Sequence, residues 1–240
     1  HTKDIDNQLK SGHPYKRWLR EHARHIEGSY DGQMTSPVDP AEVDLYQKMF
    51  QVSLEERDQV LKPLAESGNE AVGSMGDDTP MAVLSAKERS LYDYFRQKFA
   101  QVTNPPIDPL REAIVMSLEV DLGGEANVFL ERESHASRIS LTSPVLSQGK
   151  FAAIVELEQE GIPVYQLDAT YDPDSENLQQ ALSRLCEQAR AHITAAPGIL
   201  VISDFNISDQ RLPIHSLLAT GAIHHSLIRE SLRVDANLII

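Results

Sequence analysis

The sequence predicts an α/β fold in which a helical amino-terminal part precedes a parallel β-α-β-α-β unit. The last third of the chain carries three observations that support this fold. Apolar runs at 162–167, 199–202 and 237–240 have the length and composition of strands. Apolar residues recur at helical spacing over 178–193 and again after Pro213. Short connections between alternating strands and helices indicate parallel strands joined by right-handed crossovers.

Three parallel strands alone do not distinguish an open sheet from part of a β/α barrel. The chain stops at or just after the run 237–240, which reads as a buried strand without a covering helix. We therefore expect the sequence to be a fragment of a longer polypeptide, truncated at its carboxyl end.

The amino-terminal part is predicted to be helical. Residues 4–28 form an amphipathic pattern broken at 11–14, and Trp18 suits the core or, as the alternative, an anchor against another domain. Asp39 and Pro40 are typical of a helix start. Ser53 and Glu56 predict a capping box, Pro63 predicts a kink, and the sequence at 67–69 predicts the helix end.

The middle of the chain, 73–111, has the densest local signals. Ser85 and Glu88 predict a capped helix with an apolar stripe, which Thr103-Asn104-Pro105-Pro106 ends. Asp108 and Pro109 predict a further helix, ending at Gly123-Gly124. After it we expect a strand or extended segment at 127–130, a loop over 131–150 and a short helix near 151–157.

Composition excludes several classes of protein. The net charge of −14 argues against a nucleic-acid partner. The single cysteine, Cys186, excludes an internal disulfide and a multi-cysteine metal site, and it favours a reducing compartment. No apolar run reaches membrane-spanning length, and no secretion signal is recognisable.

Acidic residues follow two of the predicted strands. Asp168, Asp172 and Asp174 follow the first and Asp204 the second. Carboxylates at this edge of a parallel sheet could hold a hard divalent cation. Because Asp and Pro are common turn formers, an ordinary turn with a helix cap is the favoured interpretation.

The other polar motifs give no catalytic arrangement. Gly73 and Gly76 resemble a phosphate loop in spacing, but Asp77 and Asp78 beside them would repel a phosphate. His224 and His225 are neighbours on a helix, so their side chains diverge, and we expect packed or interfacial histidines. Cys186 lies on an apolar helical stripe, where burial would make its thiol inert.

Several separated blocks of sequence resemble one known family. They are SMGDDTPMAVLS at 74–85, LYDYFRQKFAQVTNPPIDPLRE at 91–112, LVISD at 200–204 and PIHSLLATGAIHHSLIR at 213–229, with Pro14-Tyr15 and Trp18-Leu19 near the start. Together they resemble the central domain of glutamate synthase, in its large glutamine-dependent subunit. The resemblance extends over nearly the whole chain and is weakest in the first seventy residues. Because the central domain of this family is related to the neighbouring flavin barrel, the resemblance implies a partial or degenerate β/α barrel.

The resemblance implies a place in a relay of domains. It makes residues 1–72 a helical connector that follows an amidotransferase domain, and residues 73–240 the central α/β domain. The amidotransferase domain would release ammonia from glutamine, and a flavin domain with FMN and a 3Fe-4S cluster would form glutamate from 2-oxoglutarate. This chain would hold neither cofactor and would not be catalytic alone. A small subunit or ferredoxin would deliver electrons, in the cytoplasm or, in a plant, the plastid.

The central domain of this family helps form an ammonia passage. Ammonia must travel as neutral NH₃, because burying an unpartnered ammonium is costly. We therefore expect Thr103, Asn104 and Ile107 to line or constrict the passage, and Gly76, Asp77 and Asp78 to hold the adjoining loop. The alternative for 103–107 is a rigid corner between domains.

Two alternatives of other classes remain open from the sequence. One is a free-standing, metal-dependent α/β enzyme that uses Asp168 and Asp204. The other is a binding module whose acidic surface meets a basic partner.

Overall fold

The computed structural model describes residues 2–26, 39–68, 82–87, 90–94, 117–124, 127, 129–160 and 162–240. Its contacts divide the chain into two units, residues 1–31 with 113–240, and residues 32–112. Each unit is described by itself below. The predicted division into a connector, 1–72, and a central domain, 73–240, stays a prediction.

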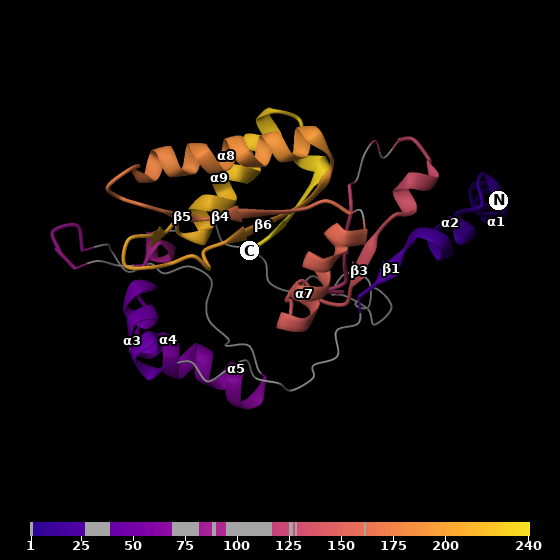
Figure 1. Cartoon of the computed structure of the whole chain (residues 1–240). Coiled ribbons are helices and arrows are strands. Elements are labelled where there is room, and N and C mark those ends of the chain that lie inside the picture. The colour runs from indigo at the N-terminus through magenta and orange to yellow at the C-terminus, as the bar shows by residue number, and fades with distance from the viewer. Residues whose placement is uncertain are drawn as a thin grey trace. The chain divides into compact units, whose positions relative to one another are not determined.

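The first unit is built on a parallel sheet of three strands, β4 (Val164–Asp168), β6 (Gly198–Ser203) and β8 (Ala236–Ile239). The strand order is β4-β6-β8, with Val164 opposite Ile199. Helix α8 (Leu178–Ala195) connects the first two strands. Helix α9 (Ser216–Arg229) and the short 3₁₀ turn η5 (Arg233–Asp235) connect the last two (Figure 1). The predicted parallel β-α-β-α-β unit is therefore confirmed.

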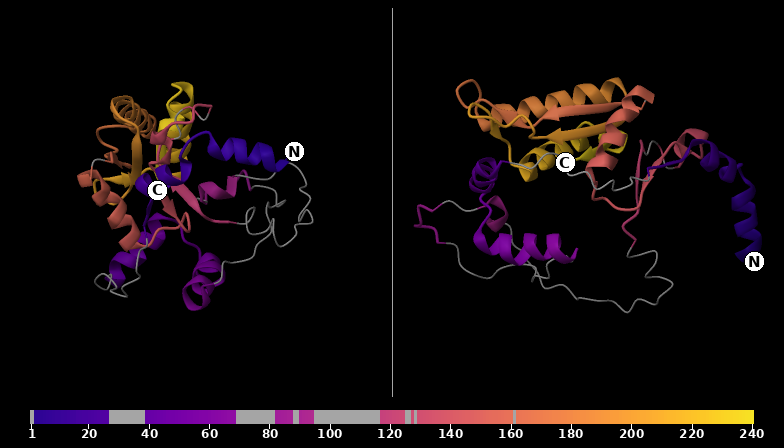
Figure 2. Two further views of the ribbon diagram at one scale, coloured as in Figure 1. Left: turned by 90° about the vertical axis from the view of Figure 1, so that its right-hand side faces the viewer. Right: turned by 60° about the horizontal axis from the view of Figure 1, so that its bottom comes forward.

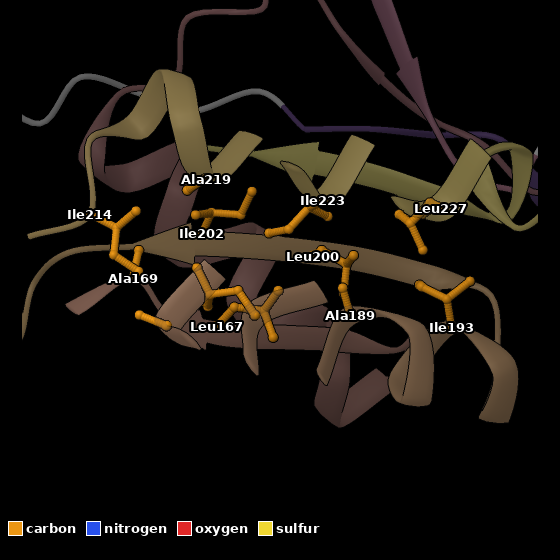
Figure 3. Packing of buried hydrophobic residues seen from close by; sticks show 13 residues of the cluster. Leu167, Ala169, Ala189, Ile193, Leu200, Ile202, Ile214, Ala219, Ile223 and Leu227 are labelled. Atoms are coloured by element: carbon orange, nitrogen blue, oxygen red, sulfur yellow. The ribbon is translucent and has the colours of Figure 1, made fainter. Parts of the chain in front are cut away.

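Both long helices cover the same face of this sheet. Leu200 and Ile202 of the central strand belong to one buried cluster with residues of α8 and α9. Figure 3 shows these side chains between Ala189 of α8 and Ile223 of α9. Helix α8 also lies along the strands in the right-hand view of Figure 2. Sequential strand order with helices on one face is how one segment of a β/α barrel is built, because each right-handed crossover returns on the same side.

The opposite face of the sheet packs on a small second sheet and a short helix. The second sheet has the order β1-β3-β2, from β1 (Arg24–His25), β3 (Ile139–Leu141) and β2 (Val120–Leu122). The helix is α7 (Gln148–Glu156), continued by the 3₁₀ turn η4 (Leu157–Glu160). The buried members of this second cluster alternate with those of the first along β6. They are Leu122, Ile139, Leu141, Ile154, Leu157, Val164, Ile199 and Val201.

The second sheet corrects three predictions. Residues 117–119 are not helical and 120–122 form β2, so no helix reaches Gly123-Gly124 as predicted. The earlier part of that predicted helix lies outside the described residues. Residues 129–130 form a turn, not an extended segment. The stretch 131–150, predicted as a loop, holds β3 and the 3₁₀ turn η3 (Glu133–Ala136). Strands this short have little local signature, because their partners lie far away in sequence.

The amino-terminal arm, residues 2–26, also differs in part from the prediction. The expected break is present, between α1 (Thr2–Ser11) and α2 (Tyr15–His22). However, the second helix ends at His22, and β1 follows it. Trp18 is half-buried and stacks on His13 at 5.2 Å between ring centroids. It belongs to neither core cluster, so the core placement was wrong, and the domain-anchor alternative stays a prediction.

The described part of the second unit contains three α-helices. They are α3 (Pro40–Met49), α4 (Leu54–Glu56) and α5 (Lys62–Ser67), and the π turn η1 (Arg57–Leu61) joins the last two. Asp39 and Ser53 accept hydrogen bonds from backbone N–H groups at their helix starts, as predicted. The irregularity expected from Pro63 is a π turn, which suits a residue without a backbone N–H. Gly68 ends α5 with a left-handed φ of 65°.

The helix predicted to begin at Ser85 is not formed in its described residues. Ser85 Oγ accepts a hydrogen bond from the Lys87 N–H, but residues 86–87 and 90 are not helical. Leu91–Tyr94 form the 3₁₀ turn η2 instead of an α-helical turn. Glu88 lies outside the described residues.

A further correction concerns Pro213. It pairs with Thr170 in a two-stranded antiparallel sheet, β5 (Thr170–Tyr171) with β7 (Leu212–Pro213), and does not start a helix. Helix α9 begins at Ser216, and His215 caps it by accepting a hydrogen bond from the Leu217 N–H at Nδ1. None of the described helices is long and apolar enough to cross a membrane.

Candidate functional site

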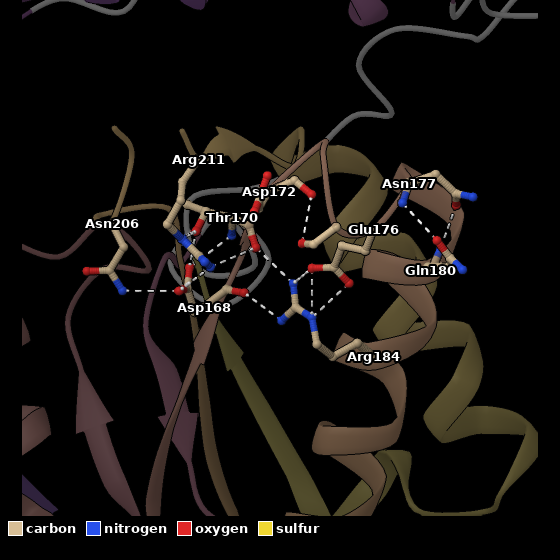
Figure 4. Close-up of polar contacts among 10 residues, drawn as sticks. Asp168, Thr170, Asp172, Glu176, Asn177, Gln180, Arg184, Asn206 and Arg211 are labelled. Atoms are coloured by element: carbon tan, nitrogen blue, oxygen red, sulfur yellow. Dashed lines mark hydrogen bonds and ion pairs between the residues drawn. The ribbon is translucent and has the colours of Figure 1, made fainter. Parts of the chain in front are cut away.

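The densest polar cluster in the first unit lies at the carboxyl end of β4, where α/β proteins commonly build their sites. Asp168, the last residue of β4, accepts hydrogen bonds at Oδ1 from the Thr170 hydroxyl at 2.6 Å and from the Thr170 N–H at 2.9 Å. Its other oxygen accepts from Arg211 at 2.9 Å and from the Asn206 side chain at 3.2 Å (Figure 4). One carboxylate is therefore held by four donors.

A second arginine closes the cluster from α8. Arg184 donates to both carboxylate oxygens of Glu176, with a shortest distance of 2.9 Å. The same guanidinium donates to the carbonyl oxygens of Thr170, at 2.8 Å, and Asp168. Arg211 reaches Thr170 as well, donating from Nε to its hydroxyl oxygen at 2.8 Å. Thr170 is fully buried at the centre of these contacts.

The surroundings of Asp168 keep it ionised. Burial by itself would raise the pKa of this carboxyl group. The hydrogen bonds from Thr170 and Asn206, together with the charge of Arg211, outweigh burial and lower the pKa below its ordinary value. Two arginines and two carboxylates also cancel in charge. Their hydrogen bonds join the end of β4 and β5 to α8 and to Arg211, the residue before β7. We call this cluster, which consists of Asp168, Thr170, Glu176, Arg184, Asn206 and Arg211, the Asp168 brace.

The acidic residues after β4 form a backbone turn, which accounts for them without a metal ion. Asp172 Oδ1 accepts from the Asp174 N–H at 2.9 Å, and the Asp172 carbonyl oxygen accepts from the N–H groups of Ser175 and Glu176. Asn177 and Gln180 then form a capping box for α8. The favoured interpretation, a turn and a helix cap, is therefore confirmed.

The alternative of a metal-dependent enzyme loses its support at this edge. Asp204 lies after β6 and accepts from the Ile207 N–H through its backbone carbonyl. Among the described residues, neither Asp168 nor Asp204 belongs to a group of three or more side chains able to hold an ion. Asp168 already has a guanidinium where a cation would bind.

Of the remaining predicted polar residues, His224 and Cys186 are half-buried, whereas His225 is exposed. His224 accepts a hydrogen bond at Nδ1 from Arg233 Nε at 2.9 Å, and the rings of His224 and His225 are nearly perpendicular, at 80°. Cys186 is half-buried, and burial raises the pKa of its thiol. The positions of His224 and Cys186 agree with the structural interpretation made from the sequence. His225 is not packed, and its placement at an interface stays a prediction.

The residues expected to form the ammonia passage lie outside the described part of the chain. They are Thr103, Asn104 and Ile107, together with the loop residues Gly76, Asp77 and Asp78. Their roles stay predictions.

Sequence reasoning missed the two arginines and the threonine of the brace. Thr170 follows the predicted strand, but nothing in its neighbours signals burial. Arg184 and Arg211 are separated from Asp168 by 16 and 43 positions. Glu176 and Arg184, eight residues apart on either side of a helix start, were the only available hint of an ion pair.

Comparison with known proteins places this fold in a family. The family model of the glutamate synthase central domain matches residues 45–240. The chain belongs to the glutamate synthase family. It is 39% identical over 241 residues to the ferredoxin-dependent glutamate synthase 2 of Synechocystis sp., covering 98% of this chain. It is 37% identical over 243 residues to the large chain of the NADPH glutamate synthase of Azospirillum brasilense, again over 98% of this chain.

The chain spans only a small part of these glutamate synthases. The matches cover 15% of the Synechocystis protein and 16% of the Azospirillum protein. A similar match to the large chain of the Bacillus subtilis NADPH enzyme, at 34% identity, covers 15% of that protein. The resemblance found in the sequence is thus confirmed, for a central domain of a much larger enzyme.

Proposed function

We propose that this chain is the part of a glutamate synthase that joins the glutamine amidotransferase domain to the FMN domain and helps form the passage for ammonia between them. The observation that carries the proposal is the family match over residues 45–240, which includes the predicted passage segment 103–107. The match to only about a sixth of each relative supports a role beside other domains of the same polypeptide.

The residues of this chain suit a connecting role better than a catalytic one. At the carboxyl edge of the parallel sheet, the charged side chains of the Asp168 brace are paired with one another. Asp168 is held ionised by donors, so it is a poor general acid. The domain would position its neighbours through a rigid α/β framework.

The iron–sulfur cluster of the complete enzyme does not fit this chain. A 3Fe-4S cluster needs three cysteine thiolates, and the sequence has one cysteine, Cys186, which lies half-buried on α8. We therefore assign the cluster to another domain, and we assign FMN to the neighbouring flavin domain that the family resemblance implies. Electrons would come from a small subunit or from ferredoxin. The enzyme would work in the cytoplasm, or in a plastid if the source is a plant.

The passage would carry neutral NH₃, so its wall should lack carboxylates and stay rigid. The segment 103–107 meets both conditions, because its prolines fix the backbone and its Thr103 and Asn104 side chains are neutral. Ile107 would narrow the passage. Gly76, Asp77 and Asp78 would hold the adjoining loop.

The decisive experiment separates transfer of ammonia from the chemistry at either end. In the complete enzyme, Asn104→Leu should abolish glutamine-dependent glutamate formation and leave ammonia-dependent formation intact. Glutaminase activity, measured separately, shows whether the amidotransferase still works.

The matched control is Asn127→Leu, at an exposed asparagine of the first unit. It should leave both activities unchanged. Equal loss of both activities in Asn104→Leu, or no loss of either, would refute the passage role and leave a rigid interdomain corner.

A further inference from the structure

We infer that Glu21, His22 and Glu133 form a site for a divalent transition-metal ion, Zn²⁺ in particular, which fastens α2 to the 3₁₀ turn η3. One ligand atom of each side chain lies within 4.8 Å of the other two. His22 Nε2 and Glu133 Oε1 are 3.0 Å apart. This inference is independent of the proposed function and rests on the first unit alone.

The donor set suits zinc better than a hard cation. Imidazole nitrogen and carboxylate oxygen are both zinc ligands, and three protein ligands can leave a further position open to water. Mg²⁺ and Ca²⁺ prefer oxygen ligands only, so a histidine argues against them. Exposure of the side chains, 41% for His22 and 48% for Glu133, leaves the approach open to an ion.

The distances between the three ligand atoms need only a small adjustment to match those around a zinc ion. Two ligands at zinc bond lengths and tetrahedral angles lie about 3.4 Å apart. The contact between His22 and Glu133 is close to this value. Glu21 is an exposed side chain, and rotation about its own bonds can bring its carboxylate closer. Its present partner is Arg17, at 3.6 Å in an exposed pair of the kind that contributes little.

The backbone holds the two ligand-bearing segments in place. Helix α2 leads through Ala23 into β1, and η3 leads through residues 137–138 into β3. These two strands pair in parallel, with Arg24 opposite Ile139, and the Arg24 N–H donates to the Arg138 carbonyl at 2.8 Å. Arg138 in turn donates to the Gly123 carbonyl at 2.8 Å, which fixes the loop after η3. The ligand positions are thus set by hydrogen bonds of the second sheet, before any ion binds.

A hollow of about 530 Å³ adjoins the site, and Glu21 and His22 form part of its wall. Ser134 and His135, which follow Glu133, line it as well. The coordination position of a bound ion that is open to water would therefore face the hollow.

The test uses the untagged 240-residue chain after treatment with a chelator. Isothermal titration with Zn²⁺ should show one equivalent bound, and Zn²⁺ should raise the unfolding temperature, because an ion that binds the folded state stabilises it. His22→Gln, Glu21→Gln and Glu133→Gln should each weaken binding by more than about tenfold, since even a change outside the ligand shell can cost ~10–100-fold. Visible absorption of Co²⁺ in place of Zn²⁺ would report the ligand geometry.

The control is His25→Gln, which removes an exposed histidine of β1 that is not one of the three ligands. It should bind Zn²⁺ like the unchanged chain. This result would show that the loss of binding is specific to His22 among the nine histidines of the sequence. The three ligands are exposed, so their variants should unfold without metal at the temperature of the unchanged chain. Absence of Zn²⁺ binding by the unchanged chain, or undiminished binding by any of the three ligand variants, would overturn the inference and leave a hydrogen bond between His22 and Glu133.

Discussion

Replacing Thr170 by valine tests the Asp168 brace with the smallest change of shape. The substitution keeps a β-branched side chain in a strand but removes the hydroxyl group. That hydroxyl donates to Asp168 at 2.6 Å and accepts from Arg211 at 2.8 Å, and the residue is fully buried. Both partners are charged, so the loss should be larger than for an ordinary hydrogen bond.

The magnitude follows from the two contacts. A hydrogen bond to a charged group contributes about 1.5–3 kcal/mol. Asp168 keeps its bonds from the Thr170 N–H, Asn206 and Arg211. Its side chain is 33% exposed, and that of Arg211 38%, so water replaces part of what is lost. We expect the free energy of unfolding to fall by about 2–4 kcal/mol.

Urea unfolding at neutral pH measures this loss as a shift of the midpoint at constant slope. The control is Ser175→Ala, which removes an exposed hydroxyl that donates to the Asp172 carbonyl at 3.2 Å. Its effect should stay within about 0.5 kcal/mol. A loss for Thr170→Val no larger than the control's would show that the brace does not stabilise the fold as argued.

The same comparison has a predicted pH dependence. The folded pKa of Asp168 lies below its ordinary value, so its contacts stabilise the protein above the unfolded pKa, about 3.9. That stability is lost as the pH falls through the folded pKa. The difference between the unchanged chain and Thr170→Val should therefore be full at neutral pH and shrink below about pH 4. A constant difference down to strong acid would refute the assignment to Asp168.

Two further predictions concern packing. Leu200→Ala, at a fully buried position of the central strand between α8 and α9, should cost about 2–5 kcal/mol in urea unfolding, whereas Leu212→Ala, at a position 41% exposed, should cost much less. Similar costs for both would contradict the placement of the core. Gly198→Ala should destabilise by about 1–3 kcal/mol, because its Cβ would lie 2.5 Å from the Pro163 carbonyl oxygen. Gly221→Ala, in α9 with nothing within 4 Å, should instead stabilise by up to about 1 kcal/mol, and a thermal melt in which both variants shift the same way would refute this reading.

The elements that could be predicted from the sequence are those with strong local patterns. Helix α8 has a capping residue, a long apolar stripe and a clear end, and β6 is a continuous apolar run buried on both faces. Both are specified by residues within the element. The parallel direction of the strands follows from the alternation of strands and helices along the chain.

The elements that were missed depend on distant partners. Strand β1 is two polar residues, Arg24 and His25, and it is a strand only because β3 runs beside it. Pro213 has the local signature of a helix start, but its pairing with Thr170 overrides that preference. The Asp168 brace is likewise assembled from segments that are remote in sequence, so its acidic members were visible and its arginines were not.

The two paired strands β1 and β3 are synthesised at different times. A ribosome adds about 5–20 residues per second, so His25 is made roughly 6–23 s before Ile139, the start of its partner strand. The Gly123 N–H donates to the Asn237 side chain at 2.8 Å, and Asn237 lies in β8, which is synthesised later still. Strand β1 is therefore synthesised well before the strand with which it pairs. A newly made chain must keep β1 from other contacts until that strand exists.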